Sequence, residues 1–268
     1  MKPRIAAAAA LVAVTVVASA CSGSQGAAGA GFQSAKPGVL TVATAFLPAP
    51  GFWEGRPPAS GFEARLAAAL AKHLGLDRVK VVQQPFAEIV AGKLAGADLA
   101  ISQLTPTAER EHSLDFTTPY VTAPPGVLAL RKVNASDVQG LRGLKWVISS
   151  ASTLTPIVKD RIRPQAAPVV VEDRSAALEV LRAGRAQALL LDLPVALGLA
   201  RAEPTRFHVL GQLSGQEGLA AALPNGSSNL EVVDSAIRRL QADGTIDRLV
   251  SHWLGQSEEN VPLIRTEQ

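Results

Sequence analysis

Polar side chains that could bind a small ligand collect at the ends of the predicted strands. In open α/β sheets, ligands bind just outside the carboxyl ends of the strands, so this placement is typical of a binding crevice. Arg110 and Asp192 offer one cation and one anion, which suits a zwitterionic ligand. The alternative is that both are solvated loop charges, and the residue types alone leave the two interpretations equally open. The full set is Thr44, Ser102, Gln103, Thr105, Arg110, Ser149, Ser150, Ser152, Thr153 and Asp192.

Metal binding and covalent catalysis have little support in the sequence. No HExxH or CxxC motif is present, and the four histidines have no mutual metal-ligand spacing. Ser214 lies in GQLSG, which differs from the GxSxG turn that carries a hydrolase nucleophile. We therefore expect no metal ion, no cofactor and no catalytic residue of these classes. The histidines are His73, His112, His208 and His252.

The elements that must position these side chains follow an α/β pattern from residue 37 onward. Two series of strands and helices are separated by an extended segment at 126–131, which predicts two lobes with a cleft. Ser228 and Glu231 predict a capping box for the first of two C-terminal helices. The predicted strands are 39–43, 79–82, 98–101, 145–148, 169–171 and 188–191. The predicted helices are 62–74, 86–94, 108–114, 153–161, 175–183, 228–242 and 246–254.

The composition excludes several classes of protein. Of the 268 residues, 47% are hydrophobic, enough to offset chain entropy, so disorder of most of the chain is excluded. The formal net charge is +3 and falls to +1 when Lys2 and Arg4 of the N-terminal segment are set aside, so no nucleic-acid partner is expected. The one long uncharged apolar run lies within the first twenty residues, which excludes a polytopic membrane protein.

The N-terminal segment has the layout of a secretory signal. Lys2 and Arg4 precede an apolar run at 6–18, and Ser19, Ala20 and Cys21 follow it. Cys21 is the only cysteine in the chain, and its position resembles that of the lipidated cysteine of a bacterial lipobox. We therefore predict a lipoprotein signal peptide at 1–20, lipidation of Cys21, and a flexible Gly-rich tether at 21–36. The alternative is an ordinary signal peptide with an incidental cysteine.

The segment Ala97–Tyr120, ADLAISQLTPTAEREHSLDFTTPY, resembles the extracellular solute-binding proteins of family 3, which serve ABC transporters of polar amino acids. The matching residues here are Asp98, Thr105, Thr107, Arg110, Asp115, Phe116, Thr117, Pro119 and Tyr120. The resemblance extends over most of the chain after the tether. Its other parts are Gly61-Phe62-Glu63 with Leu66, Leu141–Val147, Asp192 in LLLDLPVAL, and the closing block from Leu219 to Gly255.

This resemblance implies a two-lobed periplasmic-binding-protein-like fold of type II, each lobe a β-sheet flanked by helices, with two crossing strands as the hinge. It implies a first lobe at 37–125 and 219–268 and a second lobe at 126–218. The protein would be an extracytoplasmic, membrane-tethered receptor that closes on an amino acid or a related small amine-carboxylate. Its partners would be the permease subunits of an ABC transporter, and the membrane through the lipid on Cys21.

The resemblance also assigns roles to single residues. Arg110 would clamp the ligand α-carboxylate with its guanidinium fork, and Thr105 would add a hydroxyl. Ser152 and Thr153, at the start of a helix, would offer a hydroxyl and backbone N–H groups to the same anion. Asp192 would accept from the α-ammonium.

The side-chain pocket departs from the family pattern. The acidic residue that follows the first strand in the family, another ammonium partner, aligns with Ala45, and the glycine before Ser152 is replaced by Ala151. The aromatic walls would be Phe86 together with Phe52 and Trp53, although the last two could equally pack the lobe. Gln103 could reach the ligand or narrow the cleft.

Two other functions remain open for this fold. One is a dehydratase for arogenate or prephenate, which needs an acid or base in the cleft, with Glu54 as the candidate beside Asp192. The other is a sensor that reports ligand to a membrane kinase. We expect a binding protein rather than an enzyme.

Overall fold

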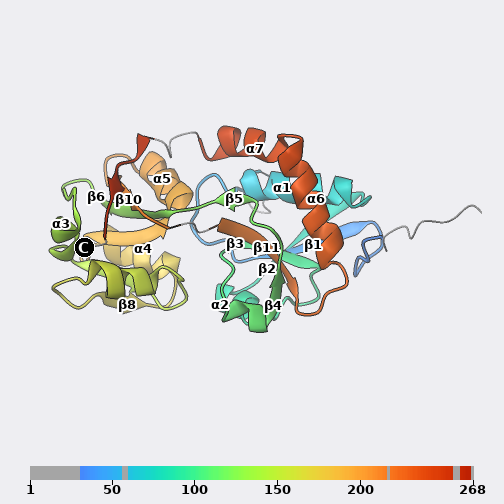
Figure 1. Ribbon diagram of the computed structural model, residues 1–268, viewed down its shortest axis with the longest axis horizontal. Coiled ribbons are helices and arrows are strands. Elements are labelled where there is room, and N and C mark those ends of the chain that lie inside the picture. The colour runs from blue at the N-terminus through green and yellow to red at the C-terminus, as the bar shows by residue number, and fades with distance from the viewer. Residues whose placement is uncertain (1–30, 56–59, 216–217, 256–259, 267–268) are drawn as a thin grey trace, which may run out of the picture. The chain divides into compact units, whose positions relative to one another are not determined.

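The computed structural model describes residues 31–55, 60–215, 218–255 and 260–266 (Figure 1). The predicted signal peptide and Cys21 lie outside these residues. From Gly31 onward the chain forms one compact unit that contains two six-stranded sheets. We call the elements around each sheet the first and the second lobe.

The first sheet has the strand order β2-β1-β3-β11-β4, with β5 paired to β11. β1 runs parallel to β2 and β3, whereas β11 runs antiparallel to its neighbours. Every residue of β1 and β3 is buried, as continuous apolar runs between covered faces require. The strands are β1 Val39–Thr44, β2 Arg78–Gln83, β3 Leu99–Leu104, β4 Leu114–Phe116, β5 Val121–Thr122 and β11 Gly218–Pro224.

Three helices of the first lobe pack against one another, and α1 also packs against β1, β2 and β3 (Figure 1). They are α1 Phe62–His73, α6 Leu230–Ala242 and α7 Thr245–Trp253. α1 buries Phe62, Leu66 and Leu70 in the core, which is the face that the four-residue spacing predicts. The short helices of this lobe are α2 Phe86–Val90 and the 3₁₀ helix η1 Arg110–His112.

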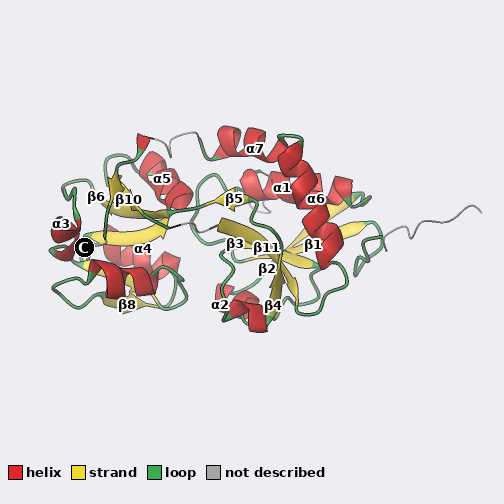
Figure 2. Cartoon of the chain, viewed as in Figure 1, coloured by secondary structure: helices red, strands yellow, loops and turns green. Residues whose placement is uncertain are grey.

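The second sheet has the order β12-β10-β6-β9-β7-β8. Its strands are drawn in yellow in the half of Figure 2 that carries the labels β6, β8 and β10. β9 and β8 run parallel to β7, while β6 runs antiparallel to β9 and β10. The strands are β6 Pro125–Leu130, β7 Trp146–Ser149, β8 Val169–Val171, β9 Ala188–Asp192, β10 Phe207–Leu213 and β12 Leu263–Ile264. The helices are α3 Val138–Arg142, the π-helix η2 Ile157–Ile162, α4 Arg174–Arg182 and α5 Leu193–Ala202.

Three local predictions differ from the structure. The helix expected at 108–114 is only the three-residue 3₁₀ helix η1, and Leu114 already belongs to β4. The segment expected as a helix at 153–161 starts with a turn and continues as the π-helix η2. Here the Ser152 hydroxyl accepts from the Leu154 N–H and the Thr155 hydroxyl donates to the Ser149 carbonyl, and such local bonds compete with an α-helix. The capping box is absent as well: Asn229 stands at the N-cap of α6 and makes no side-chain capping bond.

Both ends of the described chain differ from expectation. The tether was expected to remain flexible to residue 36, but Gln33 exchanges two hydrogen bonds with the Asn229 side chain, and Ala35 N–H donates to Asp98. At the other end, β12 pairs with β10 of the second sheet, although 219–268 was expected to lie in the first lobe. Its Ile264 is buried in the second lobe's core, and this burial accounts for the pairing.

None of the helices in the described part of the chain has both the length and the apolar character needed to span a bilayer.

Candidate ligand-binding site

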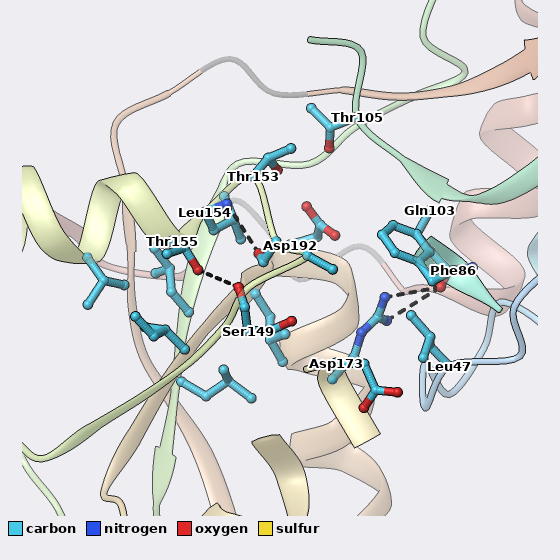
Figure 3. A pocket seen from close by; sticks show the side chains of 18 of the residues that line it. Leu47, Phe86, Gln103, Thr105, Ser149, Thr153, Leu154, Thr155, Asp173 and Asp192 are labelled. Atoms are coloured by element: carbon cyan, nitrogen blue, oxygen red, sulfur yellow. Dashed lines mark hydrogen bonds between the residues drawn. The ribbon is translucent and has the colours of Figure 1, made fainter. Parts of the chain in front are cut away.

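A pocket opens between the lobes at the carboxyl ends of β3, β7 and β9 (Figure 3). It shares several lining residues with a wider groove and is therefore continuous with it. The groove has a volume of about 1,220 Å³, which is larger than a single amino acid fills. The structure brings together seven of the nine residues predicted to bind ligand. They are Phe86, Gln103, Thr105, Arg110, Ser152, Thr153 and Asp192.

Arg110 begins the 3₁₀ helix η1, and its guanidinium spans the gap between the lobes. It donates to the Thr105 carbonyl at 2.8 Å and to the Ala151 carbonyl of the second lobe at 3.2 Å. The guanidinium carbon also lies 5.5 Å from the centre of the Phe86 ring, within range of a cation–π interaction. These contacts hold the cation in one orientation at the pocket wall.

Ser152 and Thr153 lie beside the Ala151 carbonyl that Arg110 contacts, and Figure 3 shows Thr153 at the pocket. Within the turn the Ser152 N–H donates to the Ser149 carbonyl, and the Ser152 hydroxyl oxygen accepts from the Leu154 N–H, which leaves the hydroxyl hydrogen as a donor. The Thr153 N–H, in contrast, donates to no acceptor in the described part of the chain. A guanidinium next to an available N–H is an arrangement that binds a carboxylate.

Asp192 ends β9 and stands at the N-cap of α5 on another wall of the pocket. Burial raises the pKa of its carboxyl to about 6, although the positive charges of Arg174 and Arg110 oppose the shift. The carboxyl is therefore ionised near neutral pH and can accept from an ammonium group.

Gln103 is held in place by a buried carboxylate behind the pocket. Its backbone N–H donates to Glu63 at 2.8 Å, and its side-chain amide N–H donates to the same carboxylate, which Tyr120 OH also contacts at 2.6 Å. Glu63 is fully buried, and burial raises its pKa although these hydrogen bonds oppose the rise. The backbone of Gln103 has a φ angle of +47°, which is uncommon for a residue other than glycine. The bonds to Glu63 hold both this backbone conformation and the side-chain amide in place.

Phe52 and Trp53, predicted to contact ligand, do not line the pocket. Phe52 is 0% exposed and packs edge-on against Phe62 in the core, with 5.9 Å between ring centres. Trp53 donates its indole N–H to the Ile101 carbonyl, and its ring packs against Phe46. Both rings serve the first lobe's packing, which is the alternative that their sequence pattern left open. Glu54 is exposed and accepts from the Gly51 N–H, away from the pocket lining.

Sequence reasoning does not identify Arg174, which lines the pocket from the second lobe. It is the first residue of α4, just after β8, and Asp173 caps that helix. The signal was available: β8 was predicted, and polar residues that follow a strand's carboxyl end are candidates for the crevice.

The described residues form two α/β lobes with a pocket between them. The pocket wall offers a guanidinium and a backbone N–H, from Arg110 and Thr153, and a carboxylate, from Asp192. A family model for bacterial extracellular solute-binding proteins, family 3, matches residues 42–256, so the chain belongs to this family. The predicted fold class, with two lobes of the type II periplasmic-binding-protein kind, is confirmed by similar solved structures.

Two relatives of known name align over nearly three quarters of the chain. The L-cystine-binding protein TcyJ of Escherichia coli (strain K12) is 29% identical over 202 residues, covering 73% of this chain and 74% of the relative. The ABC transporter glutamine-binding protein GlnH of Bacillus subtilis (strain 168) is 23% identical, covering 72% of each.

Solved structures agree with this assignment. An ancestral arginine-binding protein bound to glutamine has a TM-score of 0.71 and 28% identity, covering 82% of this chain and all of that one. The ancestral amino-acid-binding protein AncCDT-1, described as a precursor of cyclohexadienyl dehydratase, has a TM-score of 0.67 and 27% identity, covering 81% and 95%.

Proposed function

We propose that this solute-binding protein is the substrate-binding component of an ABC uptake system and binds an amino acid between its lobes. The main support is that one pocket holds Arg110 and the available Thr153 N–H together with Asp192. The first two suit an α-carboxylate, and Asp192 suits an α-ammonium. Thr105, buried beside Arg110, adds its hydroxyl to the carboxylate end.

The relatives support the same ligand class. The names of the two relatives and of the solved ancestral arginine-binding protein specify cystine, glutamine and arginine. The side chains of these amino acids differ, but all three share the α-ammonium and the α-carboxylate. The chemistry that those ligands share is the part that Arg110, Thr153 and Asp192 are suited to bind.

Binding would act through closure of the two lobes. Arg110 and Thr105 belong to the first lobe, whereas Thr153 and Asp192 belong to the second. A ligand that contacts both lobes stabilises the closed state more than the open one and so shifts an existing equilibrium. The closed form would then dock on the permease subunits.

We propose that the protein binds its ligand without transforming it. A dehydratase would need a positioned acid or base. Glu54 is exposed outside the pocket lining, Asp173 accepts from the Ala176 N–H as the cap of α4, and Asp192 is assigned to the ligand ammonium. Incubation with prephenate or arogenate should give no phenylpyruvate or phenylalanine. Formation of either product would overturn this part of the proposal.

An uptake assay distinguishes a transport role from a sensor role. If the protein serves transport, deletion of its gene should abolish uptake of the bound amino acid.

The test of the ligand class is calorimetry of the purified protein with a panel of L-amino acids and their des-amino and decarboxylated analogues. We expect at least one amino acid to bind and both kinds of analogue to bind more weakly. Arg110→Ala should weaken binding about 30- to 4,000-fold, because it removes one partner of a desolvated charge pair, and Arg110→Lys should recover only part.

The matched control is Arg65→Ala, on the exposed face of α1. It should leave the affinity unchanged. Near-normal affinity in Arg110→Ala, or absence of binding by every amino acid, would refute the proposal.

A further inference from the structure

We infer that Arg174 selects a ligand with a second carboxylate, that is, an amino acid that carries another carboxylate beyond its α-amino-acid head. This inference rests on the proposed function and goes further, because it assigns the side-chain end of the same pocket. Arg174 has no part in the assignments made above to Arg110, Thr153 and Asp192.

The hydrogen bonds of Arg174 leave it poorly satisfied. Its guanidinium makes three contacts, one to the Pro48 carbonyl and two to the Gln103 side-chain oxygen, each 3.4 Å long (dashed lines at Gln103 in Figure 3). Good N–H···O bonds are about 0.4 Å shorter. Within the described residues, no carboxylate lies within 4.0 Å of this guanidinium. A partly buried cation without a close anion is a costly arrangement that an anionic ligand group would relieve.

The protein surrounds the Arg174 guanidinium closely enough to remove much of its contact with water. Burial lowers the pKa of its guanidinium, and the negative charges of Asp192 and Glu63 oppose that shift. Asp173, the other carboxylate that lines the pocket, accepts from the Ala176 N–H at 2.9 Å as the cap of α4. Each charged group of the pocket except Arg174 thus has an assigned partner, either in the protein or in the amino-acid head of the ligand.

A carboxylate is the ligand group that suits this guanidinium. The guanidinium fork can bond both oxygens of a carboxylate, whereas an amide offers one oxygen and a cationic side chain would be repelled. Gln103, fixed by Glu63, keeps its side-chain oxygen facing Arg174 and so helps to hold the fork at the pocket. Glutamate and aspartate carry the second carboxylate on the side chain, and cystine carries it on a second amino-acid head.

A different role for Arg174 is a latch, since its two acceptors belong to the first lobe and its helix to the second. A latch alone would change the affinity for every ligand by the same factor. Selection of a carboxylate would change it for dicarboxylates only.

The test is calorimetry of wild type and Arg174→Gln with L-glutamate, L-aspartate and L-cystine, each against neutral ligands, L-glutamine and L-asparagine. The wild type should bind at least one dicarboxylate at least tenfold more tightly than the neutral amino acids. Arg174→Gln should lose at least tenfold for that dicarboxylate and less than threefold for the neutral ligands, which also report that the variant is folded. The ligand that shows the loss identifies which source of the second carboxylate is used.

Arg182→Gln is the matched control, on the same helix but ion-paired with Glu203 at 2.7 Å away from the pocket lining. This variant should change neither the affinity for dicarboxylates nor the affinity for neutral amino acids. Equal losses for dicarboxylates and neutral ligands, no loss in Arg174→Gln, or a wild type that prefers neutral or cationic amino acids would overturn the inference while leaving the proposed function standing. Absence of any amino-acid binding would refute the proposed function itself.

Discussion

At the scale of single residues, Asp192 carries the ammonium end of the proposed site alone. The position of the family's other acidic partner is taken by Ala45, which lines only the outer groove. Burial has brought the carboxyl's pKa to about 6, so its charge changes within an accessible pH range. Affinity should therefore follow the ionisation of this one group.

We predict that affinity for the amino acid falls as pH decreases through about 6. A protonated Asp192 offers no charge to the α-ammonium, so affinity should drop by up to about tenfold per pH unit below the pKa. Calorimetry at pH 7.5, 6 and 5 measures this. Asp192→Asn should weaken binding at pH 7.5 by about 1.5–3 kcal/mol, the net value of a hydrogen bond to a charged group.

The Asp192→Asn variant is also the control, because its affinity should be nearly independent of pH between 5 and 7.5. A pH-independent wild type, or a loss below about 0.5 kcal/mol in Asp192→Asn, would mean that the ammonium is held elsewhere.

At the scale of elements, the turn that leads into α1 depends on the absence of a side chain at Gly61. This residue has φ +103° and ψ 164°, a region open essentially to glycine. A Cβ there would lie 2.3 Å from the Phe52 carbonyl oxygen, which itself accepts from the Glu63 N–H. The turn thus sets both the start of α1 and the position of Glu63 behind Gln103.

We predict that Gly61→Ala lowers the free energy of unfolding by about 3 kcal/mol or more, since backbone strain and a steric clash add. Gly75→Ala is the matched control: its φ is +72°, but a Cβ there would meet nothing within 4 Å, so only about 1–2 kcal/mol of strain is expected. Urea denaturation measures both. Equal losses would show that the Phe52 carbonyl moves aside at no cost.

The predicted elements are mainly those with an apolar pattern of their own, although α5 and β11, which also have one, were not predicted. Elements that depend on distant partners were not predictable. β1, β3, β9 and α1 follow from local periodicity, because their own residues supply the buried face. β12 has only two residues, and its burial depends on β10, about fifty residues earlier. The π-helix η2 follows a turn whose hydroxyl bonds no apolar pattern reveals.

The site was predictable where the family motif covers it and not elsewhere. Arg110, Thr105 and Asp192 were located by motif and by strand ends, and all three line the pocket. Phe52 was misassigned because an aromatic residue in a loop looks the same in sequence whether it faces a ligand or Phe62. Arg174 was missed although it follows the predicted strand β8, because that position marks it only as a candidate and its contact with Gln103 appears only in the folded chain.

At the scale of the whole molecule, the proposed anchor is tested on the only cysteine of the chain. Cys21→Ala should release the protein into the medium or leave it unprocessed, because no diacylglyceryl group can be attached without the thiol. Fractionation with labelled fatty acid measures this. Ligand affinity of the variant should equal that of the wild type. A wild type that incorporates no label, or a variant that stays on the membrane after its signal peptide has been removed, would refute the anchor.

The last strand ties the end of the chain to the second lobe. Arg161 donates to the Thr266 hydroxyl from two nitrogens, at 3.1 and 2.8 Å, and also to the Ser214 carbonyl at 2.9 Å. Since α7 packs on α1 and α6 of the first lobe, the chain returns to the second lobe after it. The chain therefore crosses between the lobes three times: before β6, after β10, and between α7 and β12.

The two ends of the described chain are therefore fastened to different halves: Gln33 to Asn229 in the first lobe, and Ile264 to the second. A donor fluorophore attached before Gln33 and an acceptor attached after Thr266 would each travel with its own half. Closure on an amino acid would change the distance between the two dyes, and hence their energy transfer, without any label near the pocket. The fold thus supplies the attachment points for an optical reporter of extracellular amino-acid concentration.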